Sequence, residues 1–334
     1  MQIALRSHAV RLIALIISLT MADLSMGKKH KQQQFLVGDS RTIEIMKFKG
    51  KIKEDEALSA VGFVGKYLLL GADEGRKIQV LEPNSTQSVY RRVRSIDLPI
   101  AKSGASEVDI EGIAVEENTV YVVGSHTAIK KTKGKTKKNN RENVYRFKLD
   151  PGSGKLESKI KRDSLKKILK QDPILQEYLK IPNDKNGIDI EGIAVKNQYL
   201  YFGFRTPILK DIYSPVIVAK FKDLDRKDKY ELHHVNLGGN GIRDMVATND
   251  GFLILADATA EDASHYQVYF WDGRDEWNIE LDPPATRLLT QIPAAKKTRA
   301  EGITILQETE ASYSVLVIYD GVAKGNPSVF EISK

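Results

Sequence analysis

The most regular feature of the chain is a pair of short apolar runs joined by a polar turn, which recurs along its length. The heptapeptide DIEGIAV stands at residues 109–115 and again at residues 189–195. Each copy leads through a polar turn into a second apolar run, at residues 120–123 and 199–204. Two apolar runs of this length around a tight turn predict an antiparallel pair of strands.

Three looser copies of this pattern occur elsewhere, and their first strands begin near Leu58, Gly241 and Arg299. Five hairpins of one design indicate a ring or an array of repeats. The apolar runs that follow the hairpins can supply the remaining strands of four-stranded propeller blades. The sequence therefore predicts an all-β propeller with five blades, or with six if residues 35–48 and the long insertion between the identical copies supply one more.

The two ends of the repeat region predict how the ring closes. In a closed ring of repeats, the first strand often completes the last blade and removes both free edges. Residues 42–48 are the predicted closing strand, and residues 328–332 are its predicted neighbour. Between the identical copies the chain holds a lysine-rich insertion at about 129–142 and a second insertion at about 160–182, whose apolar spacing predicts two short helices on one face of the ring.

The N-terminus has the outline of a secretory signal peptide. Arg6 and Arg11 precede an apolar run at residues 12–19. This run is shorter than a membrane span of about 20 residues. The small residues Thr20 and Ala22 suit cleavage. We therefore expect a periplasmic or secreted protein with no membrane span after cleavage. A retained N-terminal anchor is the alternative.

Cleavage would divide the chain into a signal peptide at residues 1–22, a polar tail at 23–34 and a single propeller domain at 35–334. Loss of Arg6 and Arg11 leaves 49 of the 51 basic residues against 44 acidic residues, a formal charge of +5. The chain has no cysteine, so an exported domain must be stabilised by core burial rather than by disulfides. We expect this domain to be a monomer.

Much of the remaining positive charge lies in the lysine-rich insertion, where six lysines between residues 130 and 138 are followed by Arg141. Such runs are usually solvated loops. An anion-binding arm is the alternative interpretation. No aromatic residues are interleaved with the lysines, so we expect no specific nucleic-acid binding.

Hairpin geometry predicts where chemically functional side chains meet. The start of the first strand lies beside the end of the second, so these positions from every repeat share one face of the ring. The starts of the first strands hold Asp109, Glu111, Asp189, Glu191, Arg243, Asp244 and Glu301, and the ends of the second strands hold Asp73, Ser125, His126, Arg205, Asp257 and Asp320. The sequence therefore predicts a channel mouth lined by carboxylates, two arginines and one histidine.

Two classes of function are compatible with this mouth. A binding module would hold an anionic small molecule or an envelope component, with Arg205 and Arg243 as its cationic contacts. The other predicted ligand-binding residues are Asp73, Asp244, Asp257 and Asp320.

The alternative is a metal-dependent hydrolase of a phosphoester or another anionic ester. Glu111, Glu191 and Glu301 would hold the metal ion or activate water, and His126 would act as acid or base. Calcium is the candidate ion because it prefers oxygen ligands, and its predicted ligands are Asp109, Glu111, Asp189 and Glu191. A structural role is also open for Asp109 and Asp189, whose carboxylates can accept backbone N–H bonds from the next blade.

Four ordered motifs resemble a bacterial propeller family, the domain of unknown function 3616. They are the paired DIEGIA, YFGFRTPI at residues 201–208, LGGNGIRDM at 237–245, and EGI at 301–303 with VIYDG at 317–321. The resemblance implies a propeller and export, but no activity. The sequence departs from the family pattern at Asn240, where a basic residue is expected, and at Ala300, where proline is common. The Glu-Gly-Ile pattern is more distantly similar to phytase-like esterase propellers, whose calcium-dependent chemistry transfers to no particular residue.

Overall fold

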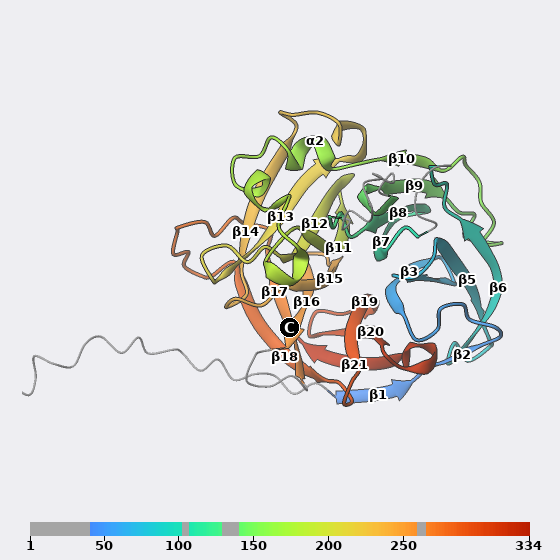
Figure 1. Cartoon of the computed structure of the whole chain (residues 1–334). Coiled ribbons are helices and arrows are strands. Elements are labelled where there is room, and N and C mark those ends of the chain that lie inside the picture. The colour runs from blue at the N-terminus through green and yellow to red at the C-terminus, as the bar shows by residue number, and fades with distance from the viewer. Residues whose placement is uncertain (1–40, 102–106, 129–139, 259–264) are drawn as a thin grey trace, which may run out of the picture. The chain divides into compact units, whose positions relative to one another are not determined.

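The computed structural model describes residues 41–101, 107–128, 140–258 and 265–334 (Figure 1). The chain forms two units, Met1–Leu36 and Val37–Lys334, and the described residues all belong to the second. The predicted signal peptide, the polar tail and most of the lysine-rich insertion lie outside the described residues. No helix in the described ranges is long and apolar enough to cross a membrane.

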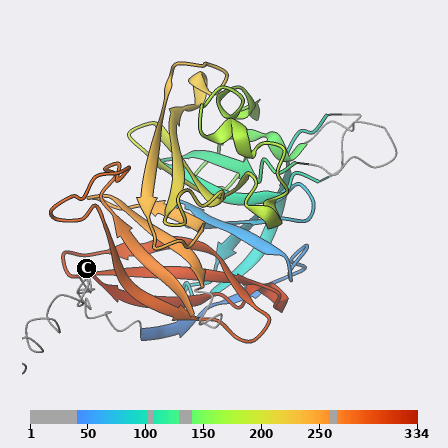
Figure 2. The same cartoon turned by 60° about the vertical axis from the view of Figure 1, so that its left-hand side comes forward.

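Five sheets form the five blades of a propeller (Figures 1 and 2). The strands of each blade are given from the centre outward. The first blade is β3 (Leu58–Val64), β4 (Tyr67–Ala72), β5 (Lys77–Pro83), β6 (Val89–Asp97) and β2 (Lys47–Lys49). The second blade is β7 (Ile110–Glu116), β8 (Thr119–Gly124), β9 (Val144–Lys148) and β10 (Lys161–Asp163). The third blade is β11 (Asp189–Lys196), β12 (Tyr199–Thr206), β13 (Tyr213–Lys220) and β14 (Tyr230–Asn236). The fourth blade is β15 (Ile242–Ala247), β16 (Phe252–Ala258), β17 (His265–Trp271) and β18 (Thr286–Pro293). The fifth is β19 (Arg299–Glu308), β20 (Ser312–Asp320), β21 (Ser328–Ser333) and β1 (Arg41–Ile45). The predicted five-bladed propeller is confirmed.

The inner strands β3, β7, β11, β15 and β19 follow one another around the ring, each in contact with the next. The glycines of the repeat permit this close approach. A Cβ atom on Gly112 would lie 2.7 Å from Cγ2 of Ile193 in the next blade, and one on Gly192 would lie 2.9 Å from Cγ2 of Ile242. Apolar side chains between neighbouring sheets then form the cores of the interfaces between blades.

The repeat glycine can be tested with a single methyl group. Gly112→Ala is expected to lower the free energy of unfolding by about 1–3 kcal/mol, because the added carbon overpacks the contact with Ile193. Gly152→Ala is the matched control, since its Cβ would meet only the Asp150 carboxylate at 3.6 Å. Urea denaturation of both variants checks the prediction, and a wild-type midpoint for Gly112→Ala would contradict it.

The N-terminal strand closes the ring as predicted. In β1, Thr42 pairs with Phe330 and Ile45 with Ser328 of β21. The predicted strand at 42–48 is, however, divided between two blades, because β2 runs parallel to β6 and pairs Phe48 with Tyr90. The side chains of Phe48 and Tyr90 are both buried, which ties the start of the chain to the first blade. In the described residues this segment adds strands to existing blades and forms no sixth blade.

The second insertion contains short helices, as predicted. These are α2 (Lys166–Leu169) and η2 (Leu175–Tyr178), and η3 (Asn183–Lys185) follows the insertion directly. Elsewhere in the described residues the short helices are η1 (Asn140–Glu142), η4 (Phe221–Asp223) and η5 (Ala323–Gly325). Ile168, Leu169 and Leu175 pack into the core between the second and third blades. The insertion therefore covers the edges of these blades.

Candidate functional site

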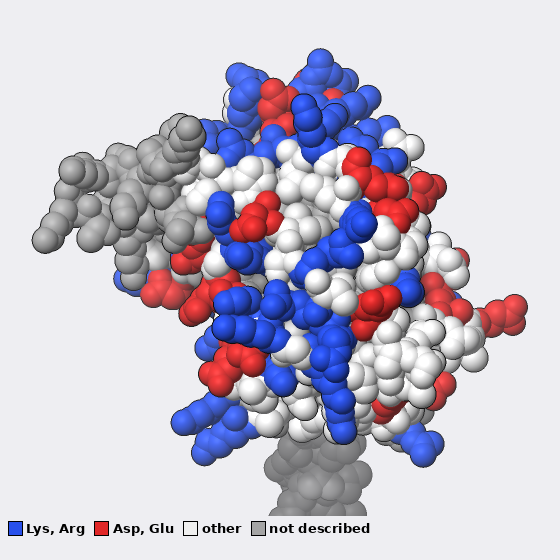
Figure 3. All heavy atoms as spheres, turned by 90° about the vertical axis from the view of Figure 1, so that its right-hand side faces the viewer, with Lys and Arg blue, Asp and Glu red and all other residues white. Residues whose placement is uncertain are grey.

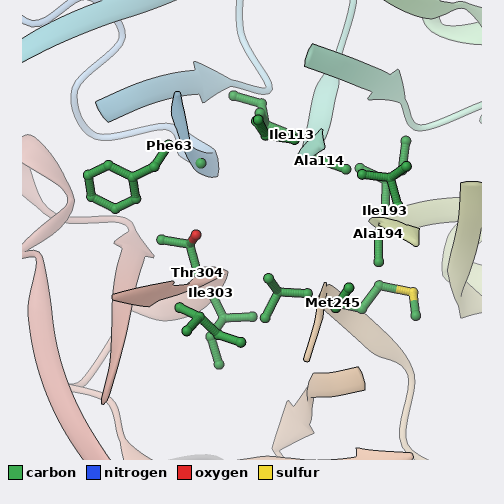
Figure 4. A pocket seen from close by; sticks show the side chains of 14 residues that line it. Phe63, Ile113, Ala114, Ile193, Ala194, Met245, Ile303 and Thr304 are labelled. Carbon is green, nitrogen blue, oxygen red and sulfur yellow. The ribbon is translucent and has the colours of Figure 1, made fainter. Parts of the chain in front are cut away.

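The channel enclosed by the inner strands has two chemically different ends. One end is a cavity of about 230 Å³, lined largely by residues with apolar side chains from the second half of each repeat (Figure 4). Ile113, Ala114, Ile193, Ala194 and Ile303 surround it. The other end, where the inner strands begin, is polar.

We call the polar end the acidic cavity. Its volume is about 190 Å³, and all five blades contribute side chains to it. It is lined by the carboxylates of Asp73, Asp109, Glu111, Asp189, Glu191, Glu301 and Asp320 and by the guanidinium groups of Arg141, Arg205, Arg243 and Arg299, together with Ala57, Ser59, Thr127 and Asn183. The predicted meeting of the repeat starts at one face is thus what the structure shows.

A β-bulge in each inner strand aims one side chain into this cavity. The pairing of β7 with β8 passes from Ile110 to Gly112 and skips Glu111. The equivalent register shifts in the other four inner strands skip Ser59, Glu191, Arg243 and Glu301. A bulge adds one residue that has no partner across the ladder and redirects its side chain. All five bulged residues line the acidic cavity.

Arg243 is the centre of the ion-pair network. Its Nε donates to Oδ1 of Asp257 at 2.5 Å, and its Nη1 donates to Oε2 of Glu191 at 3.0 Å. The same Nη1 lies 2.8 Å from both carboxylate oxygens of Glu301. The side chain is only 8% exposed, so three blades are joined through one buried guanidinium group.

Arg205 forms a second, more exposed part of the network. Its Nη1 donates to Oε1 of Glu191 at 2.5 Å and to Oδ2 of Asp189 at 3.4 Å, and its Nε lies 3.7 Å from Oδ2 of Asp257. Glu191 is therefore held by both predicted arginines. Both arginines therefore have carboxylate partners within the protein, and their positive charges are already compensated.

Two carboxylates of the cavity are less well partnered. Within the described residues, Glu111 makes no hydrogen bond or ion pair. The Oδ1 atom of Asp73 is buried without a hydrogen-bond partner in the same part of the chain. Asp109 interacts electrostatically with both of them. Asp109 itself, with a left-handed φ of 59°, bonds to Ser125 and pairs with Nη1 of Arg141 at 3.1 Å.

Burial and like charge favour protonation of several cavity carboxylates. Burial raises the pKa of Asp73 to about 6, and the charges of Asp109 and Asp320 add to this. Burial and Glu191 raise the pKa of Asp189 to about 7, against a smaller opposing effect of Arg205. Burial raises the pKa of Glu301 to about 8, although Arg243 opposes the shift.

The pKa of Glu111 is also raised well above its usual value, first by burial and then by the neighbouring acids. Burial likewise raises the pKa of Asp109. Burial and like charge therefore act in the same direction on the pKa values of Glu111 and Asp109.

Three predicted site residues, Asp244, Asp257 and His126, do not line the acidic cavity. Asp257 pairs with Arg243 and Arg205, as described above. Asp244 is buried outside the cavity, where its carboxylate accepts the backbone N–H groups of Met245 and Ile303, each at 2.8 Å. It ties β15 to β19, which is the strand-linking role that the sequence left open for Asp109 and Asp189. Those two aspartates instead face the cavity.

His126 does not line the acidic cavity. Its Nδ1 lies 2.8 Å from the carbonyl oxygen of Gly124, and its Nε2 accepts the backbone N–H of Leu165 at 3.3 Å. The ring is buried, and burial lowers its pKa to about 4. His126 therefore lies at the start of the helical insertion, and its predicted role as acid or base stays a prediction.

Several cavity residues were not predicted. Arg299 precedes Glu301 as Asp109 precedes Glu111, so the repeat itself contained the signal. Arg299 lies 3.6 Å from Asp320, the predicted partner position on β20. Asn183 comes from the helical insertion and donates to Asp189 at 3.1 Å, and no repeat pattern indicates it.

The predicted calcium site can be compared with this geometry. The donors are all oxygen atoms, which suits a hard cation. In the described part of the chain, however, no three histidine or carboxylate side chains converge as ligands of one ion. The arginines hold Glu191, Asp189 and Glu301 in ion pairs. Among the described residues, Glu111 makes no hydrogen bond or ion pair, and the buried Oδ1 of Asp73 has no hydrogen-bond partner.

Positive charge lies mainly on the outside of the propeller. Figure 3 views the side on which β6 lies in Figure 1, and lysine and arginine side chains gather there in a broad band. The neighbouring strands β2 and β6 contribute Lys47, Lys49, Arg91, Arg92 and Arg94. The basic composition of the chain is therefore compatible with an acidic cavity at its centre.

These features define a five-bladed propeller with an acidic cavity at one end of its channel. A family model described as "Protein of unknown function (DUF3616)" matches residues 57–149 and 148–327. The chain belongs to this family, which confirms the resemblance found in its sequence motifs. The more distant similarity to phytase-like esterases stays a prediction. No protein with a curated description matches the sequence.

Several solved structures are similar to the chain at low sequence identity. A GH43 β-1,3-galactosidase solved with galactodeoxynojirimycin is 9% identical, with a TM-score of 0.45, and the match covers 87% of this chain and 94% of that one. The computationally designed protein Ika4 is 12% identical, with a TM-score of 0.32 and coverage of 67% and 96%. Sqt1 from Saccharomyces cerevisiae is 10% identical, with a TM-score of 0.34 and coverage of 84% and 73%.

Proposed function

We propose that the protein is an exported ligand-binding propeller whose ligand enters the acidic cavity. The observation that supports this is the convergence of five bulged side chains, from all five blades, on one polar cavity. Packing alone does not require such side chains, because the other end of the same channel is lined largely by apolar residues. Buried ionisable groups are costly to the fold, so a site that collects them is a candidate for function.

The ligand that best matches this cavity brings positive charge. The prediction of an anionic ligand rested on Arg205 and Arg243, and both are engaged by carboxylates. The cavity is lined by seven carboxylates and four arginines, and Glu111 and Asp73 have oxygens without protein partners. We therefore propose a hard divalent cation, with calcium as the candidate, held by Glu111, Asp109 and Asp73 after a shift of their side chains. An anionic group would then bind through this ion.

Calcium titration of the EDTA-treated protein tests the proposal. Calcium at about 100 times its Kd is expected to raise the free energy of unfolding by about 2.7 kcal/mol, because the ion binds the folded state. Glu111→Gln should weaken binding at least tenfold in isothermal titration calorimetry. Glu177→Gln, an exposed site on η2, is the matched control and should bind as the wild type does.

The absence of binding heat and of a melting shift with calcium and with magnesium would exclude a divalent cation. Equal binding by Glu111→Gln and the wild type would place the ion elsewhere in the protein.

A second candidate function is hydrolysis of an anionic ester. Burial raises the pKa of Glu301 to about 8, although Arg243 opposes the shift, so this carboxyl could exchange a proton with a substrate near neutral pH. Glu301→Gln should then abolish turnover of phosphomonoester, phosphodiester or lactone substrates, with calcium binding retained. Turnover that survives in Glu301→Gln would remove this role.

Export is proposed from the N-terminal sequence alone. Arg6, Arg11 and the apolar run at 12–19 have the pattern of a signal peptide that is cleaved after Ala22. The mature chain is then expected to begin at Asp23. Mass determination of the protein purified from a cell envelope or culture fluid checks this, and an intact Met1 terminus would favour the retained anchor.

A further inference from the structure

A second polar cavity lies between the second and third blades, away from the acidic cavity. Its volume is about 290 Å³. Glu116 at the end of β7, Thr119 at the start of β8 and Lys220 at the end of β13 contribute to it. The acidic cavity lies at the opposite ends of these strands, so the two cavities open on opposite faces of the propeller. We call this second cavity the basic groove.

The basic groove contains four basic side chains, which outnumber its acidic ones. Its basic side chains are Arg146 and Lys148 from the second blade and Lys220 and Lys222 from the third. Within the described ranges, none of the four forms an ion pair with an acidic residue. Only two acidic residues, Glu116 and Glu117, line the groove, and Glu116 already accepts the backbone N–H of Gln198 at 3.1 Å.

Aromatic rings position two of these cations. The guanidinium carbon of Arg146 lies 5.8 Å from the ring centres of both Tyr121 and Phe221, which are buried. The ammonium group of Lys220 lies 4.5 Å from the ring centre of Tyr199. A cation–π contact orients a cation but leaves its net charge uncompensated. The groove is therefore a preformed region of positive potential with ordered cationic groups.

We propose that the basic groove binds a small oxyanion of two or more negative charges, such as a phosphate ester or pyrophosphate. Its concave shape suits a small molecule better than the flat surface of a macromolecule. Guanidinium and ammonium groups from two blades can contact different oxygens of one phosphate group, and such charge-assisted hydrogen bonds are strong. The contrast with the acidic cavity is that the arginines there are held by carboxylates.

Isothermal titration calorimetry with sodium pyrophosphate at low salt tests the proposal. The wild type should bind, and the Lys148→Glu/Lys222→Glu double variant should bind at least tenfold more weakly. Both lysines are exposed, so thermal melting should show that this variant folds normally. The matched control is Lys170→Glu/Lys180→Glu, two exposed lysines of the helical insertion, which changes the net charge equally and should bind as the wild type does.

Two further variants distinguish binding in the groove from attraction to the net charge of the protein or binding in the acidic cavity. Lys148→Arg/Lys222→Arg should retain binding, because the positive charge stays in place. Glu111→Gln should also retain it, since this variant affects only the acidic cavity. The proposal is overturned if the wild type does not bind pyrophosphate, or if both Glu double variants lose affinity to the same extent.

Discussion

Replacement of Arg243 by methionine is expected to lower the free energy of unfolding by about 3–5 kcal/mol, the cost of leaving buried charges without a partner. Arg243 is 8% exposed and pairs with Glu191, Asp257 and Glu301. Methionine keeps much of the side-chain volume but removes the charge and the hydrogen bonds. Urea denaturation at pH 7, followed by the fluorescence of Trp271 and Trp277, measures the effect.

Arg205→Met is the matched comparison. Arg205 is 31% exposed, so water can replace part of the lost interaction, and the expected loss is less than half as large. The loss in Arg243→Met should also be smaller at pH 6 than at pH 9, because Glu301, whose pKa is raised to about 8, is protonated at the lower pH and no longer needs a cation. Equal losses in the two variants, or a loss in Arg243→Met that does not depend on pH, would show that the network is not what stabilises this region.

The second large effect is a fall in stability above pH 6.5. The pKa values of Asp73, Asp189 and Glu301 in the folded protein are raised to about 6, 7 and 8. A raised pKa in the folded state favours folding at low pH, and this contribution is lost as the pH rises through that pKa. Each extra proton held by the folded state lowers the free energy of unfolding by about 1.4 kcal/mol per pH unit.

His126 acts in the opposite direction but in a different pH range. Its pKa falls to about 4 on burial, so its contribution is present above about pH 6.5 and is lost only as the pH falls towards 4. The range from pH 6.5 to 9 therefore reports mainly on the cavity carboxylates. Urea denaturation across this range should show the decline, and Glu301→Gln should flatten it above pH 7. A curve that rises or stays level in the wild type would contradict the assignment.

The repeat pattern was sufficient to predict the fold, because the apolar half of each hairpin and its glycine serve the packing of every blade. It also predicted that β1 pairs with β21. It did not predict that the segment at 42–48 is divided between two blades, because three residues with a single buried side chain, Phe48, give no signal of a separate strand. The parallel pairing of Phe48 with Tyr90 depends on the position of the first blade in the closed ring.

The position of the site was predictable, but its hydrogen bonding was not. Counting from the bulged residue of each hairpin, Ser125 rather than His126 corresponds to Asp73, Arg205 and Asp257. The single extra residue places His126 against the helical insertion instead of the cavity. Sequence spacing also could not show that both arginines are held by carboxylates, because this depends on side chains from three different blades.

The five β-bulges have a consequence for how this scaffold can diversify. The backbone ladder runs past each bulged residue, so its side chain takes no part in strand register. Serine, glutamate and arginine already occupy these positions in one molecule, on hairpins of the same design. The ring thus separates strand register from the chemistry of the cavity, since one backbone design presents an uncharged, an acidic or a basic group at the same place in different blades.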